Sequence, residues 1–73
     1  MAPEPMLPRV SEPEGWDRPG RSRAARVRFT DGSWRSATVL GWRHREDDWF
    51  AHLQWPGGLS EWLAYDPRYI RPE

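Results

Sequence analysis

From Arg23 onward the chain consists of short segments in which apolar and polar residues alternate, and turn-forming residues separate these segments. Alternation with a period of two places apolar side chains on one face of an extended strand, so the pattern predicts half-buried β-strands. We expect strands over residues 24–30, 34–45, 49–55 and 59–65, and a short last strand from Ile70 that ends at Pro72. No segment has the period of an amphipathic helix, so the sequence predicts an all-β chain.

The expected strands share a small apolar core. Their inward-facing positions include Val27, Val39, Leu53 and Ile70. Gly41 lies inside the longest strand and indicates a bulge or a sharp bend, and Asp66-Pro67 favours a single 3₁₀ turn before the last strand. Five short strands with tight hairpins predict a five-stranded SH3-like barrel over residues 23–73.

Residues 1–22 form a different kind of segment. They hold five of the eight prolines, and their apolar residues follow neither a helical nor a strand period. Proline removes backbone donors and disfavours helix at the preceding residue. We therefore expect a disordered, Pro-rich N-terminal arm, in which Trp16 either docks on the barrel or stays solvated.

Composition narrows the function classes. A chain of 73 residues accommodates one domain, and the absence of cysteine excludes a disulfide framework and a thiolate metal site. The N-terminus lacks an apolar run of signal-peptide length, and no stretch is long enough to span a membrane. A cytoplasmic protein without a membrane partner is therefore the expectation.

Two stretches, "DGSWRSATVLGW" and "YDPRYIRP", resemble the Tudor domains of the SH3-like barrel superfamily. The resemblance covers roughly residues 24–72 and includes an Asp-Gly turn followed by Ala-Thr and an aliphatic pair. These positions are Asp31, Gly32, Ala37, Thr38, Val39 and Leu40.

The Tudor resemblance implies an aromatic cage for methylated Arg or Lys, held by cation–π attraction. When the cage positions of a Tudor domain are matched to this sequence, the first falls at Trp55. The second falls at Gly58, which has no side chain. A third position falls at Arg28 or Phe29, and a fourth at Arg35, next to Trp34. The implied cage is therefore partial.

The chain is also similar at the level of fold to type II plasmid dihydrofolate reductase. The active pore of that enzyme uses a Val-Gln-Ile-Tyr motif, and the corresponding stretch here is Trp62-Leu63-Ala64-Tyr65. The tyrosine matches, whereas the glutamine that hydrogen-bonds the substrates is absent. This remote alternative, an oligomeric reductase, stays open as a third hypothesis.

No catalytic constellation stands out in the sequence. His44, His52 and the acidic turn 46–48 are typical of solvated turns and exposed strand positions, and they lack the spacing of a metal site. We expect a chain that is not an enzyme and uses no metal or cofactor.

The tryptophans carry the functional prediction. Five of the six fall within the barrel, more indole than about fifty residues can bury. Those beside turns and at strand ends predict an aromatic rim flanked by arginine that binds a peptide or protein partner. The predicted rim residues are Trp34, Trp55, Trp62, Tyr65, Arg28 and Arg35.

The alternative ligand is nucleic acid. Five arginines fall within eleven residues that contain no acid, and arginines beside stacking aromatics suit phosphate and base contacts. The five arginines are Arg18, Arg21, Arg23, Arg26 and Arg28. A steep salt dependence of binding would favour nucleic acid, and a flat one would favour a peptide.

Overall fold

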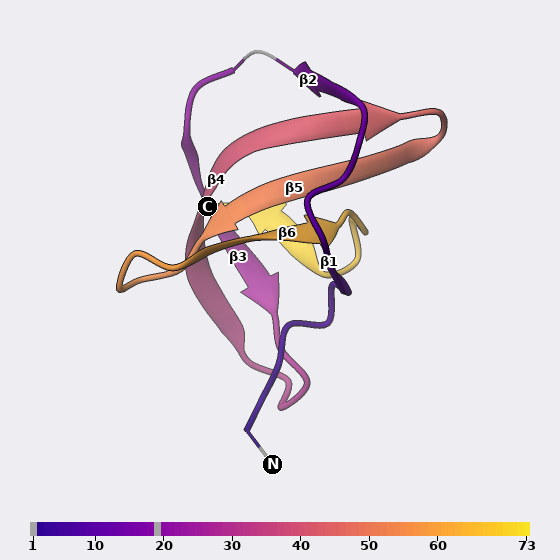
Figure 1. Ribbon diagram of the computed structural model, residues 1–73. Helices are drawn as coiled ribbons and strands as arrows, with labels where there is room; N and C mark the ends of the chain where they lie inside the picture. Colours follow the sequence, from indigo (N-terminus) through magenta and orange to yellow (C-terminus); the bar gives the residue numbers. More distant parts are fainter. Residues whose placement is uncertain (1, 19) are drawn as a thin grey trace.

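A computed structural model describes residues 2–18 and 20–73 of the chain (Figure 1). The described part is all-β, as the alternating pattern predicts, and forms one antiparallel sheet of seven strands. The strands are β1 (Arg9–Val10), β2 (Trp16–Arg18), β3 (Arg23–Arg28), β4 (Trp34–Arg45), β5 (Asp48–Gln54), β6 (Ser60–Ala64) and β7 (Ile70–Pro72).

The order of strands in the sheet is β1-β6-β5-β4-β3-β7. β4 is long enough to pair twice along the same edge, with β3 through its first half and with β2 through its second half. In Figure 1, β4 and β5 extend together as a long hairpin beyond the rest of the sheet. The path ends at β1 and at β7, so the sheet curves without closing.

The bulge predicted at Gly41 is confirmed. Val39 pairs with Leu53 and Gly41 with His52, so two residues of β4 lie opposite one residue of β5. An extra residue reverses which side of the sheet the following side chains face. Trp42 therefore pairs with the buried Ala51 and returns to the core side of the sheet.

The core lies on the concave, inner side of the curved sheet. The four predicted core residues Val27, Val39, Leu53 and Ile70 are all buried. The remaining buried apolar residues are Leu7, Ala25, Phe29, Ala37, Ala51 and Leu63. No polar side chain of the described residues is buried, so the core is purely apolar.

The N-terminal segment differs from the expected disordered arm. It contains β1 and β2, and Leu7 is fully buried in the core. Before β1, Met6 donates its N–H to Arg28 O, and Thr30 donates its N–H to Glu4 O, at 2.9 and 2.8 Å. The prolines leave too few donors for long strands, but single bridges suffice to hold the segment against the sheet edges.

Between β1 and β2 the segment crosses the outer, convex face of the sheet (Figure 1). We call residues 9–18 the strap. Arg43 on β4 holds it, because its guanidinium donates to Pro13 O at 2.6 Å and to Asp17 Oδ1 at 2.7 Å. Gly15 has φ +138°, and a Cβ there would lie 2.5 Å from His44 O, so only glycine lets the strap approach this closely.

The predicted 3₁₀ turn before the last strand is a single turn. Tyr69 donates its N–H to Asp66 O at 3.0 Å. The turn spans residues 67–69 and does not continue into a helix. Asp66 acts as the predicted cap, since its carboxylate accepts the N–H of Arg68 at 2.9 Å. Pro67 suits the first position of the turn, where its missing N–H would have had no partner.

Candidate functional site

The inner face of the sheet is uncovered where the β4–β5 hairpin extends beyond the core. Past the bulge, cross-strand partners place Trp16 beside His44 and His44 beside Trp49, and they place Arg18 beside Trp42. Partners in antiparallel strands face the same side, so these residues form two adjacent rows. We call the aromatic members, with the neighbouring Tyr65, the aromatic platform: Trp16, Trp42, His44, Trp49 and Tyr65.

The members of the platform support one another. The rings of Trp42 and Tyr65 meet edge to face with centroids 5.1 Å apart, and those of His44 and Trp49 stack at 4.3 Å. The Arg18 guanidinium lies 5.4 Å from the Trp49 ring. Trp16 is 74% exposed, Tyr65 39% and Trp49 37%. Exposed aromatic groups in contact with each other are typical of recognition surfaces.

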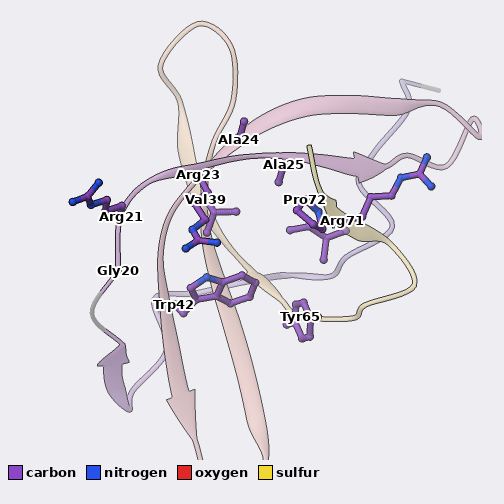
Figure 2. A pocket seen from close by; sticks show the side chains of 11 residues that line it. Gly20, Arg21, Arg23, Ala24, Ala25, Val39, Trp42, Tyr65, Arg71 and Pro72 are labelled. Atoms are coloured by element: carbon purple, nitrogen blue, oxygen red, sulfur yellow. The ribbon is translucent and has the colours of Figure 1, made fainter.

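A pocket of about 380 Å³ opens beside the platform (Figure 2). Trp42 and Tyr65 form one side of it, and aliphatic side chains form the floor. Arg23 pairs with Val39, so it faces inward, and Figure 2 shows its guanidinium directed toward Trp42. Arg21 points away from the pocket in the same view. The pocket is lined by Gly20, Arg21, Arg23, Ala24, Ala25, Val39, Trp42, Tyr65, Ile70, Arg71 and Pro72.

The pocket is cationic as well as apolar. None of its lining residues is acidic. The arginines that line it, Arg21, Arg23 and Arg71, make no ion pair within residues 2–18 and 20–73, whereas Arg9, Arg26, Arg35, Arg43 and Arg68 all do. A ligand with an apolar group and a neighbouring anion therefore matches the pocket in both shape and charge.

Only one member of the predicted rim, Tyr65, lines this pocket. Trp34 and Arg28 lie together on the outer face of the sheet, where the Arg28 guanidinium is 5.6 Å from the Trp34 ring. Trp62 lies on the outer face near the strap and contacts Arg43 and His52, at 4.5 Å in each case. The structure thus distributes the predicted rim over several surfaces.

Trp55 and Arg35 meet at a third place, around Phe29. The Phe29 and Trp55 rings pack edge to face at 5.4 Å, and the Arg35 guanidinium lies 4.3 Å from the Phe29 ring. Trp55 also donates its indole N–H to Glu61. Three of the positions implied by the Tudor resemblance are therefore neighbours, and the chain's own arginine covers the face of Phe29.

Two carboxylates have altered acidity, and both lie in turns outside the pocket. The hydroxyl and then the N–H of Ser33 lower the pKa of Asp31 by hydrogen bonding, with Arg35 adding to the effect. Hydrogen bonds from the Arg68 side chain and N–H lower the pKa of Asp66. Both groups stabilise turns, and neither faces a ligand site.

Sequence reasoning did not find Trp42 and Trp49 as site residues, and it named Arg23 only as one of five arginines for the nucleic-acid alternative. Trp49 shares the parity of Ala51 and Leu53, and that parity favours a core position, but Trp49 lies beyond the end of the core. Gly41 was the sequence feature that could have placed Trp42 on the inner face, because a bulge at Gly41 reverses the direction of the next side chain. Arg23 could have been found by extending the inward face of β3 back from Ala25.

Comparison with protein-family models, curated proteins and solved structures found no match for this chain. Over residues 2–18 and 20–73, no group of three metal-ligating side chains is present. The same part of the chain contains no helix that is long and apolar enough to cross a membrane.

Proposed function

We propose that the chain is a non-catalytic binding module for an extended peptide or protein segment, built on an SH3-like fold that is open on one side. The supporting observation is the pocket between Arg23, Trp42 and Tyr65, which faces solvent on what would be the interior of a closed barrel. A recognition pocket of this kind combines apolar walls with a single oriented polar group.

The lining favours a peptide side chain over a nucleobase. Most of the floor is aliphatic, from Ala25, Val39 and Ile70, with Pro72 at the edge. Aliphatic walls accept a branched or aromatic side chain by burying its apolar surface. Arg23 then pairs with a carboxylate on an adjacent residue of the same peptide, because its guanidinium is directed into the pocket.

A displayed library of random peptides, selected on the full chain, tests this proposal. We expect enriched peptides to share an apolar anchor next to an acidic residue, and to lose binding to Tyr65→Ser. Arg23→Gln should remove the acidic preference. Arg21→Gln is the matched control, since it makes the same charge change with a guanidinium that points away from the pocket.

Two outcomes contradict the proposal. The first is a selection that yields no peptide able to bind the wild-type chain in solution. The second is a set of enriched peptides that bind the Tyr65→Ser variant as tightly as they bind the wild type. Thermal unfolding of each variant, followed by circular dichroism, verifies that a loss of binding is not a loss of fold.

A further inference from the structure

The outer face of the sheet is divided into two halves. The strap covers the half formed by β5, β6 and the end of β4, whereas the half formed by β7, β3 and the start of β4 is uncovered (Figure 1). Cross-strand pairing places Arg71 beside Arg26, Arg26 beside Ser36, and Arg28 beside Trp34 on this uncovered half. We call it the basic face: Arg26, Arg28, Trp34, Ser36, Thr38 and Arg71.

Positive charge is concentrated on the basic face. The guanidinium carbons of Arg71 and Arg28 lie 3.9 and 5.6 Å from the centre of the same Trp34 ring. The only ion pair on this face within the described part of the chain joins Arg26 to Glu73 at 3.4 Å. Like charges this close repel each other, so an anion bound between them lowers the electrostatic energy.

The surface next to these arginines is polar and hollowed. A groove of about 360 Å³ is lined by the polar residues Ser36, Thr38 and Gln54, by Trp55 and the β5–β6 turn, and by Glu73, the partner of Arg26. Short hydroxyl and amide side chains hydrogen-bond sugars and phosphates, and they offer little apolar area to an amphipathic helix. The groove therefore suits a polar chain, and the arginines beside it supply the attraction for an anion.

We propose that the basic face binds single-stranded nucleic acid. Arg26, Arg28 and Arg71 contact phosphates, and Trp34 supplies a stacking surface for one base. The base takes the place of the Arg71 guanidinium on the indole, and the released guanidinium contacts the neighbouring phosphate. A duplex keeps its bases stacked within the helix, so only a single strand can use both the indole and the arginines.

This inference goes beyond the proposed peptide site, because the two sets of side chains face opposite sides of the sheet. Arg71 borders both surfaces, and Figure 2 shows its guanidinium directed away from the pocket. Arg23 faces inward with Val39, while Arg26 and Arg28 face outward with Ser36 and Trp34. Both ligands can bind the same molecule, which would make the chain an adaptor between a protein segment and a nucleic-acid strand.

Fluorescence anisotropy with a short labelled oligothymidylate and the full chain tests the proposal. We expect Trp34→Leu to weaken binding about tenfold. Single Gln substitutions of Arg26, Arg28 or Arg71 should weaken it and lower the slope of log affinity against log salt by about 0.7 each. Arg45→Gln is the matched control, since Arg45 is exposed on the β4–β5 hairpin, away from the basic face.

A gain-of-binding variant separates recognition from damage to the fold. Glu73→Gln removes the carboxylate that pairs with Arg26, so it should tighten binding of the oligothymidylate. A variant that merely perturbs the structure would weaken it. The Tyr65→Ser variant should bind the oligothymidylate normally, so failure of the peptide site and failure of the basic face remain distinguishable.

Several results would overturn the proposal. They are no binding at low salt, equal affinity for a duplex of the same length, and an Arg45→Gln effect as large as that of Arg28→Gln. Competition by a phosphorylated peptide at the same concentration as the oligothymidylate would reassign the basic face to a protein ligand.

Discussion

The guanidinium carbon of Arg43 lies 4.5 Å from the centre of the Trp62 indole, on the outer face of the sheet. The same side chain donates hydrogen bonds to Pro13 and Asp17 in the strap, and only 17% of it is exposed. One arginine therefore joins the strap to the sheet. Trp62, a predicted ligand contact, serves here as the surface on which that arginine rests.

Replacing Arg43 should loosen the strap. Arg43→Met keeps an apolar stem over Trp62 but removes the donors to Pro13 and Asp17, so the free energy of unfolding should fall by about 1–3 kcal/mol. Asp17 is 74% exposed, so the ion pair itself contributes little of this. Hydrogen exchange should accelerate at residues 16–18. Arg45→Met, an exposed neighbour on the same strand, should leave both quantities unchanged.

A methyl group at position 15 should separate the strap from β4. In Gly15→Ala the added Cβ meets His44 O, and the backbone is held at a φ of +138°, which alanine rarely adopts. We expect destabilisation by about 1–3 kcal/mol, measured by denaturant unfolding. Gly20→Ala is the control, because nothing lies within 4 Å of its added Cβ. Equal stability of the two variants would contradict the close approach of Gly15.

Leu7 should be as important to the core as the residues of the central strands. It is fully buried, although it lies in the proline-rich segment. Leu7→Ala should cost about 2–5 kcal/mol, similar to Leu53→Ala. Leu59, which is 79% exposed, provides the comparison, and its replacement by alanine should change stability by less than about 0.5 kcal/mol. An unchanged melting temperature for Leu7→Ala would show that the segment does not pack against the core in solution.

Asp31 should contribute to the acid sensitivity of the fold. Hydrogen bonds from Ser33 keep its pKa below the usual 3.8 in the folded state. The stabilisation is therefore complete above that value and is lost as the pH falls through the folded pKa. Asp31→Asn should flatten the acid side of a melting-temperature profile. In an NMR titration, Ser33→Ala should raise the pKa of Asp31; no change would contradict this cause.

The sequence predicted the parts of the fold that depend on strand periodicity. Val27 and Leu53, which are both buried, each lie between two polar residues, and burial of one sheet face favours such alternation. The observed limits of β4, residues 34–45, also agree with the predicted ones, because turn-forming residues flank that strand. Gly41 indicated the bulge because a glycine inside a strand often marks a bulge or a sharp bend.

The candidate site was less predictable because it depends on pairings between distant segments. The bulge reverses the direction of Trp42, and only the register of β4 with β5 shows that this side chain faces the core side. The strap pairs with β4 and β6 through a few backbone contacts, whereas the prolines of residues 1–22 favoured disorder. A short segment with one buried leucine has no periodic pattern that would identify it.

The strap also bears on how the chain acquires its structure during synthesis. Arg9 contacts Glu61, 52 residues further along the chain, and β1 has no partner until β6 has been made. Contacts so far apart carry a large loop-closure entropy and slow folding. Until β6 is available, the prolines keep the N-terminal segment extended and leave it few free backbone donors. This limits its pairing with other chains. Residues 9–10 are thus made before the rest of the sheet but are among the last to reach their native position.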